Sequence, residues 1–592
     1  RDVPVTVGGP IQDVKDRRRL ANLEITSRPV RYYPGGGFAA HVVGYVNSER
    51  QPAYGVEQYL DKALRGVDGQ LHTAGDALRE VIPFDLPVDG VATDGTDVTL
   101  TIDSGMQRIV ETELVNAIRN SRAASGTIIV MDPKTGAILA MASWPSADLN
   151  AYFELANQPR YNNPAVSAQY EPGSVFKVVT ASAAIEHSLI KLDQKFFAET
   201  GTYTIKYSDG EIRKITDTHP YGVLTFQEAV EHSSNIVMAK ASNLIGAELL
   251  YTTARNFGFG VATGVELPGE VNGELKKPSQ WSGATLNSMA IGYEVGATPI
   301  QIAAAYAAVA NNGVLMKPYV LKQELNEHHE VVSETHPQAI RKVIGKNTAQ
   351  LLTRIFEGVV ERGTGVSARH EYISVAGKTG TSRKVIDGKY EPGKYTASFA
   401  GFFPAEDPKV VCLVMLDNPH EGGYTGGLAS APIFKAIAEK IIATSSWVTR
   451  PEQPVIARKE NLVVPDVAGL DVEVASSMLS GRGFEIEQFG GGKVVLRQSP
   501  SPGTRTLPGT PVKITTSKTG VAVPKGFTIV PDVRRMSIRR AMNRLTMEDL
   551  EVVIAGSGVI VAQSPAPGQQ VKVGTRVLLR CEPRGSRLVA QN

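Results

Sequence analysis

Ser174-Val-Phe-Lys177 is the sequence feature that most constrains this chain. On a helix, residues three apart share a face, so Lys177 would lie beside the hydroxyl of Ser174 and could take its proton. A serine becomes a good nucleophile only when a neighbouring base does this. The same spelling recurs as Ser188-Leu-Ile-Lys191, which we expect to be an exposed helix end. Only the first copy is preceded by Glu-Pro-Gly and followed in order by two further motifs, which selects Ser174 as the candidate nucleophile.

The two further motifs are Ser233-Ser-Asn235 and Lys378-Thr-Gly-Thr381. The first is the only Ser-x-Asn in the chain, whereas Lys-Thr-Gly occurs three times. The copy at Lys134 lies between two apolar runs and indicates a hairpin turn. The copy at Lys518 lies among repeats near the end of the chain. The copy at Lys378 precedes an apolar run over 396–403, which is typical of a strand at a sheet edge.

For Lys177 to act as a base near neutral pH, its ammonium group must lose a proton. That requires the pKa to fall by about three units from its usual value of about 10.4, at a cost of about 4 kcal/mol. Burial and the positive charge of Lys378 are the expected causes of this fall.

Bulk composition excludes several classes of protein. A length of 592 residues suggests about three to five domains. A formal net charge of +2 argues against a dedicated nucleic-acid binder. Cys412 and Cys581 are the only cysteines, and they indicate neither a disulfide framework nor a metal site. The histidines show no ligand spacing, so we predict no metal and no cofactor.

The middle of the chain, residues 98–447, is expected to form one large α+β domain in which helices cover an antiparallel sheet. Residues 1–97, which are punctuated by Gly and Pro, form a separate region before it. The elements predicted by apolar spacing and capping are a strand over 98–102, a helix capped by Asp103, a hairpin over 126–142, a helix over 299–310 and a helix from 429 to about 444.

Residues 448–461 form a polar, Pro-rich linker, and the chain repeats itself beyond it. Val464-Pro-Asp-Val467 returns as Val530-Pro-Asp-Val533, and Gln498-Ser-Pro500 returns as Gln563-Ser-Pro565. Each unit predicts an extended entry, a helix and short strands. Two copies indicate two small α+β domains, over 462–518 and 528–582, rather than a solenoid, which needs more repeats.

The order Ser-x-x-Lys, Ser-x-Asn, Lys-Thr-Gly matches the motif set of penicillin-binding proteins and serine β-lactamases. The chain resembles a class B penicillin-binding protein with two C-terminal PASTA domains, and the resemblance covers nearly all of it. It rests on segments along the whole chain, namely Arg31-Tyr-Tyr-Pro34, Ala40-His-Val-Val-Gly44, Gly55-Val-Glu57, Tyr170 to Lys177, Ser288 to Tyr293, Thr298 to Gln301 and the repeated Val-Pro-Asp-Val. It implies a transpeptidase domain on an N-terminal pedestal.

The resemblance also implies a D,D-transpeptidase that cross-links peptidoglycan stem peptides, at the septum, and is acylated by β-lactams. The implied roles are Ser174 as nucleophile, Lys177 as general base, Ser233 as proton relay, Asn235 as ligand of the substrate amide, Lys378 as holder of the terminal carboxylate, Thr379 and Thr381 as hydroxyl donors beside Gly380, and the N–H groups of Ser174 and Thr381 as the oxyanion hole.

The implied location is the extracytoplasmic face of a bacterial cytoplasmic membrane, with a glycosyltransferase of the division or elongation machinery as partner. No apolar run approaches the roughly eighteen residues that span a bilayer. Because the chain begins at Arg1 rather than Met, we expect a membrane anchor upstream of it. Whether such a protein serves division, elongation or sporulation stays open at this point.

Two alternatives remain open on the sequence. One is a hydrolase of the same fold, a carboxypeptidase or β-lactamase, for which Glu294 is a candidate base. The other is a non-catalytic wall-binding scaffold or β-lactam sensor. The second repeat also carries five arginines, which form either a solvated face or a surface for an anionic wall polymer or partner: Arg534, Arg535, Arg539, Arg540 and Arg544.

Overall fold

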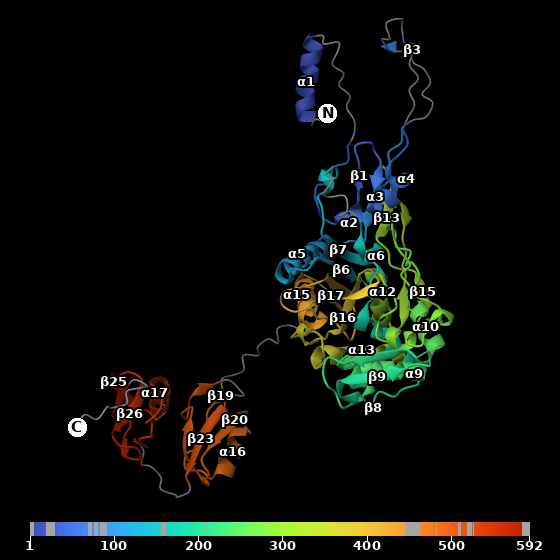
Figure 1. Cartoon of the computed structure of the whole chain (residues 1–592). Helices are drawn as coiled ribbons and strands as arrows, with labels where there is room; N and C mark the ends of the chain where they lie inside the picture. The colour runs from blue at the N-terminus through green and yellow to red at the C-terminus, as the bar shows by residue number, and fades with distance from the viewer. Residues whose placement is uncertain are drawn as a thin grey trace, which may run out of the picture. The chain divides into compact units, whose positions relative to one another are not determined.

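The computed structural model describes residues 5–18, 30–68, 74–75, 81–82, 92–154, 162–208, 210–386, 388–444, 462–480, 482, 484–506, 511–517, 524, 526–546 and 548–582. The chain divides into two compact units, Arg1–Ser445 and Ser446–Asn592. Figure 1 gives the order of the elements in each. The predicted linker over 448–461 and the Lys-Thr-Gly copy at Lys518 lie outside the described residues.

A five-stranded antiparallel sheet with the order β16-β17-β18-β6-β7 forms the centre of the first unit. Its strands are β16 (Ala376–Ile386), β17 (Lys389–Phe403), β18 (Val410–Asp417), β6 (Ser125–Met131) and β7 (Ile138–Trp144). Neighbouring side chains of β17 point to opposite faces, and both faces are covered. This two-sided burial explains the unbroken apolar run of β18.

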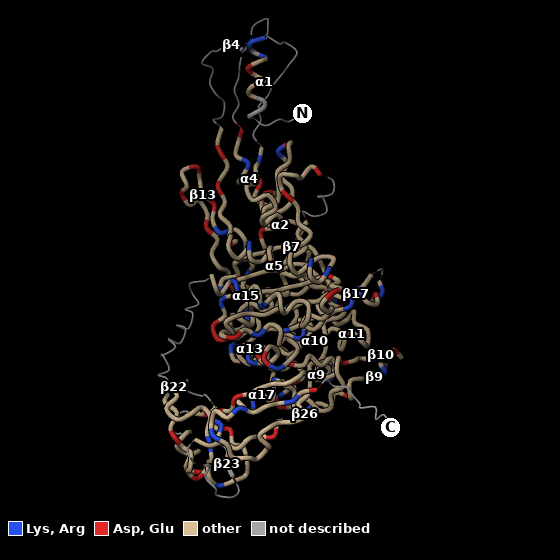
Figure 2. Tube along the Cα trace, turned by 90° about the vertical axis from the view of Figure 1, so that its left-hand side faces the viewer, with Lys and Arg blue, Asp and Glu red and all other residues tan. Residues whose placement is uncertain are grey.

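Two helices show how the sheet is covered. Phe399 and Phe403 of β17 pack against Phe434 of α15 (Ala431–Thr444), with ring centroids 4.7 and 5.8 Å apart. Ala400 and Phe402 belong instead to the core cluster that contains α12 (Pro299–Ala310). Helix α12 is buried on every side, which explains its alanine content. Figure 2 shows basic and acidic residues interspersed along the tube of this unit.

The predicted elements of this region are found with small changes in their ends. The helix capped by Asp103 is α5 (Ser104–Ser121), and Asp103 Oδ1 accepts the N–H of Met106 at 2.8 Å. The hairpin is β6 and β7, and α12 has the predicted bounds. Helix α15 begins at Ala431 rather than at 429, because a separate turn, α14 (Gly426–Ala429), precedes it.

Further helices and short strands complete this part of the unit. The helices are α6 (Pro164–Ser167), α7 (Lys177–Glu186), α8 (Phe226–Glu231), α9 (Asn235–Ile245), α10 (Ala247–Asn256), α11 (Thr285–Met289) and α13 (Lys346–Glu361). The strands are β5 (Asp97–Leu100), β8 (Lys195–Phe197), β9 (Thr202–Lys206), β10 (Ile212–Thr216), β11 (Val223–Thr225), β12 (Val314–Met316), β13 (Leu321–Leu325), β14 (Val331–Glu334) and β15 (Ala339–Lys342).

Glu57 links two segments of the N-terminal region. Its carboxylate pairs with Arg31 at 2.8 Å and accepts the Tyr33 hydroxyl proton at 3.2 Å, so two segments noted in the sequence meet here. The elements are α1 (Val5–Arg18), α2 (Ala40–Val43), β1 (Tyr45–Val46), β2 (Pro52–Ala53), α3 (Gly55–Tyr59), α4 (Asp61–Leu64), β3 (Ala74–Gly75) and β4 (Val81–Ile82).

The second unit contains the two repeats, each with its own apolar core. The first has β19 (Leu462–Val463), α16 (Val472–Ser480), β20 (Glu485–Phe489), β21 (Val494–Ser499), β22 (Arg505–Thr506) and β23 (Pro511–Ser517). The second has β24 (Phe527–Ile529), α17 (Ile538–Thr546), β25 (Glu551–Gly556), β26 (Val559–Ser564), β27 (Gln570–Lys572) and β28 (Arg576–Glu582). Each places a parallel and an antiparallel pair in one three-stranded sheet.

One glutamine explains why the two repeated motifs occur together. In the first repeat, Gln498 accepts the N–H of Val467 at 2.6 Å and donates to the carbonyl of Pro465 at 2.7 Å. In the second, Gln563 makes the same two bonds, to Val533 at 2.8 Å and to Pro531 at 2.9 Å. The side chain therefore fastens the extended entry of each repeat to its sheet.

An ion pair with a buried carboxylate generates the first prediction. The carboxylate of Glu231, at the end of α8, has no exposed surface and accepts hydrogen bonds from Arg362 Nε and Gln227 Nε2, both at 2.8 Å, although the Arg362 side chain is itself 57% exposed. Arg362→Ala should lower the free energy of unfolding of the first unit by about 1 to 3 kcal/mol, because a buried carboxylate loses its charged donor. Urea unfolding of the chain would measure this.

Arg369→Ala is the matched control, since Arg369 pairs with Glu361 at 3.7 Å and both side chains are more than half exposed. An exposed pair contributes about 1 kcal/mol or less. Equal losses in the two variants would contradict a structural role for the buried pair.

Candidate active site

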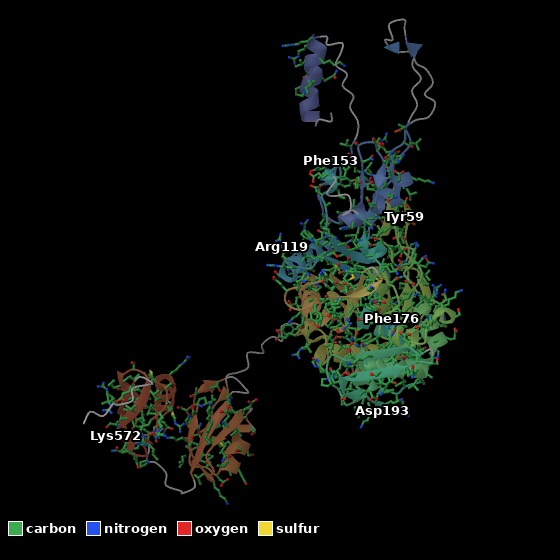
Figure 3. All side chains as sticks on the ribbon, viewed as in Figure 1. Tyr59, Arg119, Phe153, Phe176, Asp193 and Lys572 are labelled. Atoms are coloured by element: carbon green, nitrogen blue, oxygen red, sulfur yellow. The ribbon has the colours of Figure 1, made fainter. Side chains whose placement is uncertain are left out.

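Ser174 lies in a short 3-10 helix, η3 (Gly173–Phe176), that leads directly into α7. The sequence predicted an α-helical relation between Ser174 and Lys177. In a 3-10 turn the side chains at positions i and i+3 eclipse each other, so the two residues still share a face. Phe176, labelled in Figure 3, is fully buried, and its ring lies 4.9 Å from that of Phe259. This contact anchors the turn in the core.

Gly173 brings the turn against the edge of the sheet. Its φ of +57° lies in the left-handed region, and a Cβ there would lie 3.0 Å from the carbonyl oxygen of Thr381. Its N–H donates to the carbonyl of Gly292 at 3.0 Å. A glycine is therefore required immediately before Ser174, and the nucleophile turn lies beside β16.

Lys177 joins this turn to the second motif. Its ammonium group donates to the carbonyl and hydroxyl oxygens of Ser233 at 2.7 and 3.1 Å, and to Asn235 Oδ1 at 2.7 Å. The Lys177 side chain is fully buried. Ser174 Oγ is half-buried and has no hydrogen-bond partner within the described ranges. The structure thus brings Lys177 into direct contact with Ser233 and Asn235, and no hydrogen bond joins Lys177 to Ser174 Oγ among the described residues.

The pKa values of both lysines in the site, Lys177 and Lys378, are strongly lowered. Burial lowers the pKa of Lys177 to about 7, although the carboxylate of Asp217 acts in the opposite direction. Burial, together with the positive charge of Lys177, holds the pKa of Lys378 well below its usual range. Burial was an expected cause for Lys177, whereas the repulsion between the two lysines acts on Lys378. The arrangement can hold a neutral amine beside a serine near neutral pH.

Asp217 is a site residue that the sequence did not reveal. Its carboxylate accepts the hydroxyl of Ser234 at 2.6 Å and the N–H groups of Asn235 and Ile236 at 2.5 and 3.1 Å. It therefore fixes the start of α9 and the orientation of the Ser-x-Asn motif. Asp217 follows directly after β10, and nothing in its local spelling marks it.

The third motif lies on β16, which is an edge strand of the sheet, as predicted. Lys378 is fully buried and donates to the carbonyl of Thr379 at 3.2 Å. The hydroxyl of Thr379 is bonded to that of Thr364 at 2.6 Å, and Thr381 Oγ1 accepts the N–H of Gly426 at 3.0 Å. Gly380 is tightly enclosed, because a Cβ there would lie 2.4 Å from Ser398 Oγ.

Two of the other copies of the motifs lie away from the site, as predicted. Ser188 and Lys191 are exposed at the end of α7. Lys134 lies in the turn between β6 and β7, where it pairs with Asp407 at 2.7 Å. Glu294, the candidate base of a hydrolase, has its carboxylate engaged by Thr285 at 2.7 Å and Arg213 at 3.2 Å.

The described residues contain neither a metal-binding cluster nor a membrane-spanning helix. Within these ranges, no group of three or more His, Cys, Asp or Glu is arranged to hold a metal ion. Across the same ranges, none of the helices combines the length and apolar character needed to cross a membrane.

Comparison with known families accounts for most of the chain. Residues 126–439 match the penicillin-binding protein transpeptidase domain, and residues 10–100 match the penicillin-binding protein dimerisation domain. Residues 462–518 and 528–582 each match the PASTA domain.

Named relatives and solved structures agree with these matches. Stage V sporulation protein D of Bacillus subtilis is 32% identical over 84% of this chain and 77% of its own length. Peptidoglycan D,D-transpeptidase FtsI of Escherichia coli is 30% identical over 74% of this chain and 71% of its own. The crystal structure of penicillin-binding protein 3 from Mycobacterium tuberculosis with aztreonam superposes with a TM-score of 0.63 and 32% identity, covering 72% of this chain and 91% of that one.

One assignment follows from the motif order, the buried Lys177 and these matches. The chain belongs to the class B penicillin-binding proteins, with a dimerisation domain before the transpeptidase domain and two PASTA domains after it.

Proposed function

We infer that the chain is a peptidoglycan D,D-transpeptidase that forms cross-links through an acyl-enzyme on Ser174. Ser174 Oγ attacks the carbonyl of a D-alanyl–D-alanine bond, an ester forms and D-alanine leaves. An amine of a second stem peptide then displaces Ser174 and forms the cross-link. The observation that carries this proposal is the fully buried Lys177, whose pKa of about 7 makes it a competent base.

Lys177 and Ser233 move the protons of the first step. Neutral Lys177 takes the proton of Ser174 Oγ as the new C–O bond forms. The hydrogen bond of 3.1 Å between Lys177 and Ser233 supports a relay in which Ser233 passes a proton to the departing amine. Without this proton the amine would leave as an amide anion, which is a poor leaving group.

The remaining motif residues bind the substrate. Asn235 Nδ2 gives one of its two protons to the carbonyl of Thr216 at 2.9 Å, which leaves the second for a substrate amide. Lys378 provides positive charge for the terminal carboxylate, and Thr381 retains a donor proton because its oxygen accepts from Gly426. The N–H groups of Ser174 and Thr381 form the oxyanion hole in this proposal.

The setting follows from the same assignment. We place the protein at the extracytoplasmic face of a bacterial cytoplasmic membrane, held by an upstream anchor and working beside a glycosyltransferase that supplies glycan strands. β-Lactams act as acyl donors that resemble the D-alanyl–D-alanine end. Crystal structures of a Mycobacterium tuberculosis relative, penicillin-binding protein 3, are complexes with aztreonam and with ampicillin.

Penicillin should add one covalent adduct, on Ser174, because its carbonyl is an acyl donor for the activated hydroxyl. Intact-mass measurement with peptide mapping would detect it. Ser174→Ala should abolish the adduct, whereas Ser188→Ala, in the exposed copy, should retain it. The adduct should persist for minutes or longer; rapid turnover would favour the hydrolase alternative. An adduct on any other serine would refute the assignment.

Lys177→Ala should slow acylation by about 10²- to 10⁴-fold, the usual contribution of a positioned base. Lys177→Arg should be no better, since a guanidinium group cannot lose its proton.

In the unsubstituted protein the base must be neutral, so the acylation rate should fall about tenfold per pH unit below about 7 and level off above it. Stopped-flow acylation over pH 5–9 would measure this; a flat profile would contradict a lysine base.

Removal of the PASTA domains should leave acylation intact, because they have their own cores and contribute no residue to the three motifs of the site at Ser174. A chain that ends at Thr449 should be acylated by penicillin at close to the rate of the full-length chain. The Ser174→Ala variant of the same truncated chain is the negative control. A folded truncation that has lost most of its acylation would make the repeats part of the catalytic unit.

A further inference from the structure

A cavity of about 450 Å³ lies beside the nucleophile turn and has no role in the chemistry described so far. Its walls come from four places: the residues just before Ser174, the segment at 274–276, the turn at 294–296, and the β16–β17 hairpin just beyond Thr381. The charged and hydroxyl-bearing side chains in these walls include Glu171, Glu274, Glu294, Lys276, Arg383 and Tyr390.

Most of the charges in these walls are already neutralised. Glu294 pairs with Arg213 at 3.2 Å and Glu274 pairs with Lys276 at 3.5 Å. Lys384, which also lines the cavity, pairs with Asp417 at 2.7 Å. In each of these three ion pairs the two opposite charges neutralise each other, so the cavity is not simply an acidic cluster.

Two groups of opposite sign remain without an ionic partner in the described residues. Glu171 Oε2 is shielded from solvent and has no hydrogen-bond partner there. Arg383 is exposed, and its guanidinium group forms no ion pair in the same residues. The cavity thus has one uncompensated carboxylate, buried in its wall, and one exposed guanidinium group.

The other carboxylate oxygen of Glu171 holds the side chain in position. Glu171 Oε1 accepts the N–H of Glu294 at 2.7 Å and the hydroxyl of Tyr390 at 3.2 Å. The ring of Tyr390 packs edge-on against Tyr293, 5.6 Å away. Burial raises the pKa of Glu171, which agrees with a carboxylate that lacks compensation in the free protein. Glu171 is fixed by Oε1, whereas Oε2 is buried without a partner in the described residues.

The position of the cavity relates it to the second half-reaction. In the proposed function, the carboxylate of the departing D-alanine is bound at Lys378 and Thr381, so its amine leaves on that side of the acyl carbon. The attacking amine must reach the same carbon and take the place of the departed amine. Arg383 follows Thr381 by two residues on β16, and Glu171 precedes Ser174 by three, so the cavity borders this place.

We propose that the cavity binds the acceptor through an α-amino carboxylate group, with its ammonium on Glu171 and its carboxylate on Arg383. An arginine and a carboxylate form a bidentate, directional pair, which suits a ligand that must be oriented. The acceptor is then the amino-acid-like end of a stem peptide, with amine and carboxylate on one carbon. This inference rests on the proposed transpeptidase function and adds the chemistry of its second substrate.

The transfer step balances with these groups. The acceptor nitrogen forms an amide bond to the acyl carbon, and the ester bond to Ser174 Oγ breaks. Of the two protons that the ammonium group loses, one ends on Ser174 Oγ and the other goes to solvent. No oxidant, metal or further reactant is needed.

The test compares two acceptors that differ only in a carboxylate, D-alanine and ethylamine. The protein is acylated with a D-alanyl thioester donor, and the ratio of aminolysis to hydrolysis product is measured for each amine. Because both products come from one acyl-enzyme, the ratio is independent of the acylation rate. The unsubstituted chain should favour D-alanine over ethylamine about tenfold, the effect of one ion pair of about 1.4 kcal/mol.

Two variants separate the two contacts. Arg383→Gln should abolish the preference for D-alanine and leave the ratio for ethylamine nearly unchanged. Glu171→Gln, which keeps an oxygen for the N–H of Glu294, should lower the ratio for both amines severalfold. Lys389→Gln is the matched control, since Lys389 is an exposed cation of the same hairpin that does not line the cavity; it should change neither ratio.

The outcomes distinguish this inference from the function on which it rests. If the preference for D-alanine survives Arg383→Gln, the acceptor carboxylate is bound elsewhere, such as at Thr381, and the inference is wrong. An equal loss for both amines in Arg383→Gln would also overturn it, because a disturbed fold rather than a lost contact would explain that result. If penicillin forms no adduct with the unsubstituted chain, the transpeptidase function itself fails.

Discussion

The burial of one lysine amine is the constraint on which the site depends. Removing the Lys177 ammonium from water disfavours its charged form, and this brings its pKa down to about 7. Three oxygen acceptors, at 2.7 to 3.1 Å, hold the amine between α7 and the start of α9. Asp217 moderates the effect, since its negative charge favours the ammonium form. The balance leaves a base that changes protonation near neutral pH rather than one that is permanently charged or permanently neutral.

The sheet edge supplies the opposite wall of the site. Because β16 has a neighbour on one side only, the turn that carries Ser174 can lie against its free side. Close approach is possible because a glycine precedes Ser174: a Cβ on Gly173 would lie 3.0 Å from the carbonyl oxygen of Thr381 on β16. The edge position of the Lys-Thr-Gly motif and the glycine before Ser174 are therefore two parts of one packing requirement.

The sequence predicted what repeats or follows a local pattern. The cap at Asp103, the buried helix over 299–310 and the hairpin around Lys134 all depend on neighbours in the chain, and all three are found. Asp217 could not be predicted, because it acts on Asn235 across eighteen residues and belongs to no motif. Nor could the ion pair of Glu231 with Arg362, which lie 131 residues apart. Residues that position the motifs act through tertiary contacts and leave no local signal.

The two PASTA repeats keep one backbone conformation at a position where their residues differ. Gly469 in the first repeat has a φ of +82°, and Arg535, at the matching place in the second, has a φ of +64°. Both donate their N–H to the sheet, at 2.8 Å to Val495 and at 2.7 Å to Ile560. A non-glycine residue in this conformation costs about 1 to 2 kcal/mol. The second repeat carries that cost and still keeps an arginine there.

Helices α16 and α17 of the two repeats have equivalent buried residues but different exposed residues. The buried positions of α16 and α17 agree, since Ala475 and Leu479 in the first repeat correspond to Ala541 and Leu545 in the second. The exposed positions do not agree: Glu473 at the start of α16 corresponds to Arg539 in α17. One core and one glutamine contact are therefore compatible with two surfaces of different charge. The repeats are alike in the contacts that fold them and differ in the charges that they present to solvent.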